Sequence, residues 1–261
     1  MRSVGRFARS VFQVDTYRAM MDTVVGQSQL LRWTGRTRGT YASFAEAREA
    51  IPSFSVDGFH SPASANILED LRHIYSSDYP VMFWMGRILP RARRIFDFGG
   101  HVGLSFYAYQ QYLPYPAGLE WTICDVPEAV RVGRELASLE QAEGLHFTTS
   151  FDHAEGTDLL LAAGSLQFIE EPLWLQLDGL RNKPAHLVIN KVPLSDGASF
   201  VTLQNIGQAM CPYRIFNRDE FRNGLEDAGY EIVDEWTNPD LSCSVPHRTV
   251  PAFSGMYLTL R

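Results

Sequence analysis

The sequence has few of the features that mark secreted, metal-binding and membrane proteins. Its three cysteines, Cys124, Cys211 and Cys243, are an odd number without Cys-x-x-Cys spacing, so they indicate neither a disulfide framework nor a zinc site. Histidines with metal-ligand spacing are also missing, and we expect no metal. No run approaches the roughly 18 apolar residues that span a bilayer, and the N-terminus lacks a secretion signal. We therefore expect a soluble protein in a reducing cytoplasm.

Charge is distributed unevenly along the chain. The net charge is -7, yet residues 1–40 carry seven arginines against two aspartates, a local charge of +5. The acidic remainder argues against nucleic acid as a partner, because phosphate backbones require a basic surface. The basic leader interleaves arginine with apolar residues such as Phe7 and Phe12. Two interpretations stay open, namely weak contact with an anionic membrane surface or packing of the apolar stripe on the protein body.

The order of apolar patterns predicts a helical N-terminal region, residues 1–90, followed by an α/β domain, residues 91–261. Within the leader, the capping box from Ser43 to Glu46 predicts a helix start. The later patterns predict strands at 94–98, 119–124, 145–148, 158–162, 186–190, 230–236 and 256–260, with helices at 102–113, 127–139, 170–180 and 217–228. Residues 191–216 are expected to be irregular. The fold class is therefore a Rossmann-like, seven-stranded, mostly parallel sheet.

A glycine-rich loop directly follows the first of these strands and opens a helix. Its members are Asp97, Gly99, Gly100, His101 and Gly103. Glycines at such a turn let a nucleotide approach the backbone closely. An acid at the strand end would repel a pyrophosphate, whereas it suits the sulfonium and ammonium of S-adenosylmethionine. The loop thus predicts a site for S-adenosylmethionine, with His101 near the methionine end.

A second acid, Asp125, ends the next strand, 22 residues after Gly103. A carboxylate in this position can accept hydrogen bonds from both ribose hydroxyls. Asp152, after the third strand, is a candidate for the adenine amino group or a solvated turn acid. The remaining predicted cofactor contacts are Val126, Gly164 and Ser165.

The last two strands follow one another without a helix between them, so they predict an antiparallel hairpin. With the two acids, this pattern resembles the class I, Rossmann-like, S-adenosylmethionine-dependent methyltransferases over residues 94–261. Nearly the whole chain also resembles a narrower family of bacterial methyltransferases, often encoded beside surface-polysaccharide genes. That resemblance rests on Trp33-Thr-Gly35, residues 41–47 (Tyr-Ala-Ser-Phe-Ala-Glu-Ala), Phe96-Asp-Phe-Gly-Gly100 with Gly103, Gly164-Ser-Leu-Gln-Phe-Ile169, and Pro212-Tyr-Arg-Ile-Phe216. It implies use of the cofactor and names no acceptor.

The catalytic candidates are Gln167, Tyr213 and His247. Transfer from a sulfonium needs alignment more than acid-base help, but a hydroxyl acceptor would also want a base. Some plant-type O-methyltransferases share the Asp-hydrophobic-Pro sequence found here at residues 125–127. These enzymes have a catalytic histidine after the fourth strand, and the nearest residue of this chain by spacing is Gln167. Glutamine cannot act as a base, so it would instead orient a substrate hydroxyl. His101 is an alternative base.

These patterns favour an enzyme that methylates a small acceptor, with a hydroxyl of a saccharide or lipid-linked sugar suggested by the resemblance alone. Two other hypotheses stay open. One is a non-catalytic protein that keeps the fold and binds the cofactor. The other, nicotinamide-dependent oxidoreduction, is disfavoured by Asp97 and by the lack of a Tyr-x-x-x-Lys pair after the fourth strand.

Overall fold

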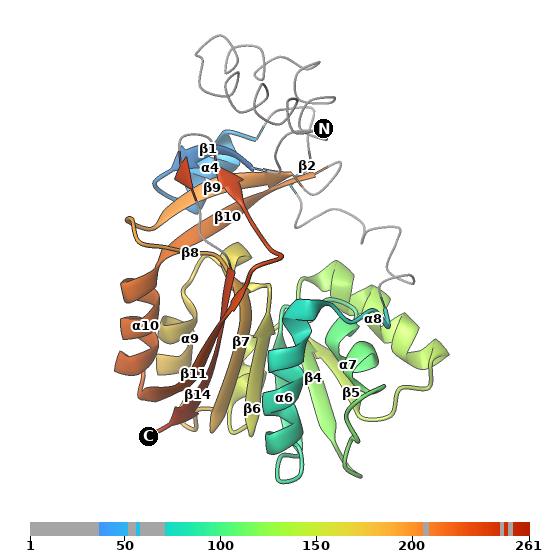
Figure 1. The fold of residues 1–261 in the computed structure, drawn as a ribbon. Coiled ribbons are helices and arrows are strands. Elements are labelled where there is room, and N and C mark those ends of the chain that lie inside the picture. Colours follow the sequence, from blue (N-terminus) through green and yellow to red (C-terminus); the bar gives the residue numbers. More distant parts are fainter. Residues whose placement is uncertain (1–36, 52–55, 58–70, 206–208, 246–247, 250–252) are drawn as a thin grey trace.

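The computed structural model describes residues 37–51, 56–57, 71–205, 209–245, 248–249 and 253–261. These residues form a seven-stranded sheet with helices on both faces and a smaller sheet at one end (Figure 1). No helix among them is both long and apolar enough to cross a membrane.

The seven-stranded sheet has the order β11-β14-β7-β6-β3-β4-β5. Its strands are β3 (Arg94–Phe98), β4 (Glu120–Cys124), β5 (Leu145–Thr148), β6 (Leu159–Ala163), β7 (His186–Val192), β11 (Tyr230–Asn238) and β14 (Phe253–Leu260). Strands β3 to β7 are parallel, and β14 is antiparallel to both β7 and β11. Because the strand order reverses between β3 and β6, their carboxyl ends frame the crevice where such sheets bind ligands.

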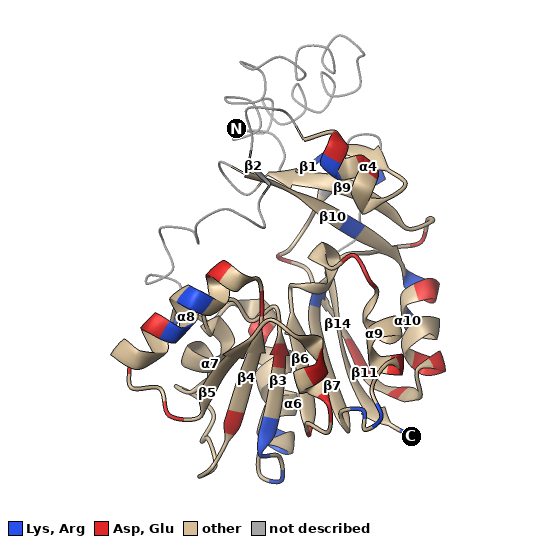
Figure 2. Ribbon diagram, turned by 180° about the vertical axis from the view of Figure 1, so that it is seen from behind, with Lys and Arg blue, Asp and Glu red and all other residues tan. Residues whose placement is uncertain are grey.

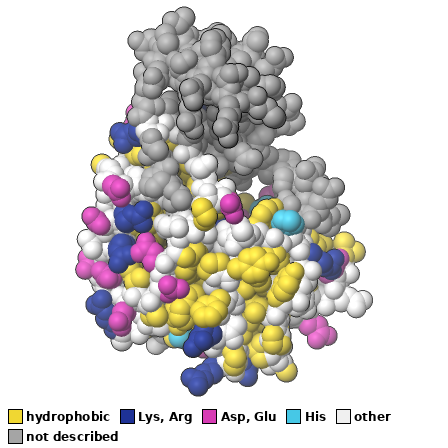
Figure 3. All heavy atoms as spheres, viewed as in Figure 1, with side chains coloured by type: hydrophobic (Ala, Val, Ile, Leu, Met, Phe, Trp, Pro, Cys, Tyr) yellow, Lys and Arg dark blue, Asp and Glu magenta, His cyan; other side chains and the backbone are white. Residues whose placement is uncertain are grey.

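Each face of this sheet is covered by helices that bury alternate strand residues. Helices α6 (Tyr79–Ile88), α7 (Leu104–Tyr109) and α8 (Pro127–Leu139) pack on one face, over Ile95 and Trp121. Helices α9 (Leu173–Asp178) and α10 (Arg218–Asp227) pack on the other, over Phe96 and Leu160. Near-continuous apolar strands buried on both faces are what a parallel sheet requires. Helix α6 exposes Tyr79 and Phe83. Figure 3 shows apolar side chains gathered on the face of the molecule that is viewed in Figure 1.

A second sheet lies beyond the carboxyl ends of the parallel strands (Figure 1). It has the order β1-β9-β10-β2, with β8 also pairing with β10. Its strands are β1 (Thr37–Tyr41), β2 (Val56–Asp57), β8 (Leu194–Ser195), β9 (Phe200–Asn205) and β10 (Ala209–Asn217). Helix α4 (Phe44–Glu49) packs Phe44 and Ala47 against Val201, Leu203 and Met210 of this sheet. A short pair, β12 (Ser244–Val245) with β13 (Arg248–Thr249), completes the strands of the described residues.

The fold class is confirmed, including the antiparallel C-terminal hairpin and a helix over Pro127–Leu139. The prediction of an irregular stretch over 191–216 was wrong, because β8, β9 and β10 lie there. Pro212 obscured β10 in the sequence, since proline cannot donate to a sheet. It is tolerated because β2 and β8 pair only with residues 209–210 and 216–217, leaving that edge of β10 unpaired at Pro212 within the described chain.

The helical interpretation of the leader is confirmed for α4 and α6 and wrong for β1 and β2. Ser43 does cap α4, accepting a hydrogen bond from the Glu46 amide at 3.1 Å. Strand β1 owes its conformation to pairing with β9, more than 150 residues away, which local patterns cannot reveal. The domain boundary at residue 91 stays a prediction.

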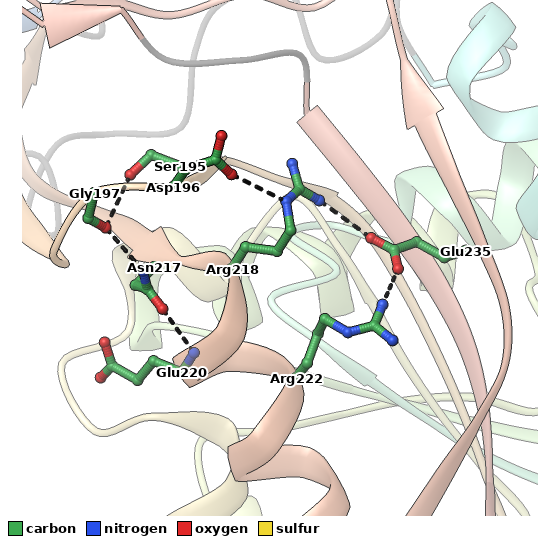
Figure 4. A network of polar contacts seen from close by, with 8 residues as sticks. All are labelled: Ser195, Asp196, Gly197, Asn217, Arg218, Glu220, Arg222 and Glu235. Atoms are coloured by element: carbon green, nitrogen blue, oxygen red, sulfur yellow. Dashed lines mark hydrogen bonds and ion pairs between the residues drawn. The ribbon is translucent and has the colours of Figure 1, made fainter.

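A polar network ties the loop after β8 to α10 and β11 (Figure 4). Arg218 of α10 contacts Asp196 at 3.5 Å and Glu235 of β11 at 3.2 Å, and Arg222 forms an ion pair with the same Glu235. Asn217 accepts a hydrogen bond from the Glu220 amide and donates one to the Gly197 carbonyl. We call these contacts the joint, because they fix the connection between the two sheets.

Candidate functional site

The loop between β3 and α7 has an unusual backbone. Gly99, His101 and Gly103 have φ values of 75°, 57° and 104°, in the left-handed region that side chains rarely adopt. The Gly99 amide donates to the Cys124 carbonyl at 2.8 Å, which ties the loop to the end of β4. A non-glycine residue held at positive φ, as His101 is, marks a place where the surrounding structure overrides local preference.

Asp97 lies directly beneath this loop. Its side chain is 1% exposed and accepts one hydrogen bond, from the Trp121 indole at 3.1 Å. A Cβ added at Gly100 would lie 2.5 Å from the Asp97 carboxylate, so only glycine permits this approach. Burial, opposed by the indole and assisted by the Asp125 charge, raises the pKa of Asp97 from 3.8 to about 7.

Asp125 directly follows the last residue of β4, the strand that lies beside β3 (Figure 2). One carboxylate oxygen accepts from the His101 amide at 2.8 Å, and the other accepts from the Val126 amide at 2.7 Å. Each oxygen keeps a further lone pair, because a carboxylate oxygen can accept two hydrogen bonds. The structure thus brings the two predicted acids to one glycine loop.

Gly164 and Ser165, after β6, form the opposite rim. The Ser165 hydroxyl donates to the Phe98 carbonyl, and a Cβ at Gly99 would lie 2.2 Å from that of Ser165. Gly164 itself has a φ of 94°, and its amide donates to the Asn190 carbonyl at 2.9 Å. These contacts place the predicted cofactor residues of β3, β4 and β6 around one edge of the sheet.

Two buried polar atoms near this edge lack a hydrogen-bond partner within the described part of the chain. The Gln167 amide nitrogen donates to the Gly164 carbonyl at 2.8 Å, while its oxygen has no donor. The second atom is Nδ1 of His101. Buried polar atoms without partners carry a free-energy cost, so they suit a site that a ligand completes.

A polar cluster around Asn190 and Lys191 adjoins the same edge; their place at the carboxyl end of a parallel strand made them candidates from the sequence, with a structural role favoured. Lys191, another residue at positive φ, forms an ion pair with the buried Asp78 at 2.8 Å. The Asn190 side chain is fully buried; it donates to the Ser77 carbonyl and accepts from the Trp236 indole and the Asn238 amide. The partners of Asn190 and Lys191 could not be predicted from the sequence, because they come from distant segments of the chain.

The remaining predicted residues fall elsewhere. Asp152 is exposed on the turn η4 (Phe151–Ala154) and accepts from Ser150, so its role toward adenine stays a prediction. Tyr213 is 2% exposed in the second sheet, edge-on to Phe168, and burial raises its pKa well above the ordinary value. That environment does not suit a base. His247 lies outside the described residues.

This edge of the sheet therefore has a buried acid with a neutral partner, a second acid with free lone pairs, and a glycine loop whose backbone lies directly against the buried acid. No Lys or Arg of the described ranges forms an ion pair with Asp97, so its charge is available to a cation. In the same residues, no group of three or more His, Cys, Asp or Glu could hold a metal ion.

Comparisons with known proteins show similarity of the fold only. No protein-family model and no curated protein matches the chain. It is similar to the solved structure of MtfA, a glycopeptide N-methyltransferase complexed with S-adenosyl-L-methionine, at 10% identity over 71% of this chain and 94% of that one, with a TM-score of 0.51. It is also similar to S-adenosylmethionine-bound CalS10, an amino pentose methyltransferase from Micromonospora echinaspora, at 13% identity over 77% and 100%, with a TM-score of 0.50. The chain therefore has the fold found in these methyltransferases.

Proposed function

We propose that the protein is an S-adenosylmethionine-dependent methyltransferase that acts on a small acceptor. The observation that supports this most directly is the buried Asp97 carboxylate beneath a left-handed glycine loop, with a neutral indole as its side-chain partner. A buried carboxylate in a nonpolar surrounding is costly unless a cation accompanies it. The fold adds support, because both solved structures described above contain S-adenosylmethionine.

The residues present fit this cofactor. Gly99 and Gly100 let the loop lie directly against Ser165 and Asp97, where an added Cβ would collide with these side chains. Asp97 supplies negative charge, and Asp125 offers lone pairs for ribose hydroxyls. When bound, S-adenosylmethionine supplies an electrophilic methyl group whose departure leaves a neutral thioether. The chain's own task is then to orient an acceptor and exclude water, since a neutral leaving group needs no acid.

For the acceptor we propose a hydroxyl of a saccharide or of a lipid-linked sugar. CalS10 acts on an amino pentose, which supports a sugar as one class of substrate for this fold. The unpartnered oxygen of Gln167 could accept a hydrogen bond from such a hydroxyl, in keeping with an orienting role. The base, for which His247 was predicted, and the kinship with methyltransferases encoded beside surface-polysaccharide genes stay predictions.

The test is isothermal titration calorimetry with S-adenosylmethionine and S-adenosylhomocysteine. The wild type should bind both, and Asp125→Ala should bind them at least about tenfold more weakly, because the ribose would lose two acceptors at about 1 kcal/mol each. Glu143→Ala, which removes an exposed acid after α8, is the matched control and should leave binding unchanged. Absence of binding by the wild type would defeat the proposal, and fluorescence enhancement of NADH would favour a nicotinamide enzyme instead.

A second candidate is a non-catalytic protein that binds the same cofactor. It is favoured because neither Gln167 nor Tyr213 can act as a base. An amide does not take up a proton, and a deeply buried phenol stays protonated. The two candidates differ in turnover. Release of S-adenosylhomocysteine with a panel of sugars, phenols and amines would establish the enzyme, whereas cofactor binding without release across that panel would favour the scaffold.

A further inference from the structure

Among the described residues, the side chain of Asp97 accepts its one hydrogen bond from a neighbouring strand. Trp121 lies in β4 opposite Ile95, two residues before Asp97 on β3, so both side chains lie on the same face of the sheet as diagonal neighbours. The indole is fully buried, and its Nε1 lies 3.1 Å from an oxygen of Asp97. In the described chain, no other side chain donates a hydrogen bond to this carboxylate.

The indole is held in place from two sides. Phe106 of α7 packs edge-on to it, with ring centroids 5.7 Å apart and an interplanar angle of 82°. Tyr115 packs at the same centroid distance with an angle of 35°, and its own hydroxyl donates to the Phe106 carbonyl at 2.8 Å. A buried indole normally finds a partner for its N–H, and here the packing aims that N–H at one oxygen of Asp97.

The electrostatic environment of Asp97 makes this hydrogen bond important for the ionisation of the carboxyl group. The negative charge of Asp125, which follows β4, repels the charge of Asp97. The phenols of Tyr109 and Tyr115 are neutral, and burial together with the charge of Asp97 raises their pKa values. Within the described residues, the hydrogen bond from Trp121 is the interaction that lowers the pKa of Asp97, because it is donated to the charged form.

We propose that Trp121 is a positioning residue for the cofactor: its indole N–H holds the Asp97 carboxylate ionised and oriented beneath the glycine loop, ready to receive a cation. The inference rests on the proposed function and adds a residue to the site. Trp121 lies within a strand and its ring packs into the core, so a binding role is not evident from its position.

The experiment is the pH profile of S-adenosylhomocysteine affinity, measured by calorimetry from pH 5.5 to 8.5 on the full chain. Wild-type affinity should rise with pH, with a midpoint near pH 7, and level off above about pH 8, where Asp97 is almost fully ionised. Trp121→Phe should move the midpoint upward by about one unit, which is about a tenfold loss at pH 5.5 and about a fivefold loss at pH 7 that shrinks toward pH 8.5. Tyr230→Phe, which removes a buried hydrogen bond to the Pro184 carbonyl and leaves the packing around the indole intact, should keep the wild-type profile.

A purely structural role for Trp121 would lower the affinity equally at every pH, and that result or an unchanged profile would overturn the inference. Should Trp121→Phe not fold, 3-benzothienylalanine incorporated at position 121 keeps the ring shape and removes only the N–H. Failure of the proposed function looks different, because the wild type itself would then bind nothing at any pH.

Discussion

The edge of the sheet at the glycine loop and the joint differ in how far their polar side chains are paired. At the joint, Glu235 is shared by Arg218 and Arg222, and the Asn217 side chain is satisfied as both donor and acceptor (Figure 4). At the loop, Asp97 is more deeply buried yet has one neutral donor, and buried atoms of His101 and Gln167 have no partner in the described residues.

This contrast separates groups that serve stability from groups that serve binding. Paired charges at a half-buried joint contribute modestly to holding two parts together. A buried acid without a cation instead lowers stability until a ligand completes it. Substitutions in the two regions should therefore have effects of different kind as well as size, and the following experiments would break or sharpen that difference.

The largest effect is expected for Gly100→Ala. The new Cβ would lie 2.5 Å from the Asp97 carboxylate, so either the loop or the acid must move. We expect cofactor affinity to fall roughly 100-fold, or about 2.7 kcal/mol, by calorimetry. Gly197→Ala at the joint is the control, because nothing lies within 4 Å of its added Cβ, and its affinity should match the wild type. Equal losses in both variants would remove the distinction between the regions.

The next effect should have opposite signs for binding and stability. Asp97→Asn removes a buried charge, so we expect about tenfold weaker cofactor binding together with an increased free energy of unfolding in denaturant titrations. The control is Asp158→Asn, at the amino end of β6, where one carboxylate oxygen accepts from the amides of Arg93 and Arg94. That variant should lose stability and keep its affinity. A stability loss in Asp97→Asn would contradict the interpretation.

The same acid predicts how stability depends on pH. Its folded pKa of about 7 exceeds the ordinary 3.8, so between these values the folded state binds more protons than the unfolded state. The contribution of Asp97 to stability must therefore fall as pH rises from about 4 to about 7, and stay low above. The measurement is the difference in unfolding free energy between the wild type and Asp97→Asn across that range. A difference independent of pH would show that Asp97 is ionised throughout.

The smallest effect is expected at the joint. Glu235→Gln should lower the free energy of unfolding by about 1 kcal/mol, since partly exposed ion pairs are worth little. Cofactor affinity should not change, because no contact described for Glu235 reaches the glycine loop. Glu231→Gln, an exposed acid on the same strand, controls for the loss of charge and should leave stability as it was. A loss of cofactor affinity in Glu235→Gln but not in Glu231→Gln would show that the joint also affects cofactor binding.

The sequence alone determined most of the seven-stranded sheet and the positions of its two acids. Strands β3, β4 and β5 and helix α8 obey local rules, since apolar runs, Pro127 and the glycine loop each fix the conformation of the residues beside them. The carboxyl ends of parallel neighbours meet at one edge, so Asp97 and Asp125 could be placed together without coordinates.

Tertiary structure alone decided the second sheet, the Lys191 cluster and the indole above Asp97. Strand β1 pairs with β9, and Asp78 pairs with Lys191, across more than a hundred residues of chain. Such contacts depend on which surfaces meet after the chain collapses, and no periodicity records them. Trp121 carries the same lesson on a smaller scale: its sequence position shows an apolar residue in a strand, while only packing by Phe106 and Tyr115 directs its N–H to the carboxylate.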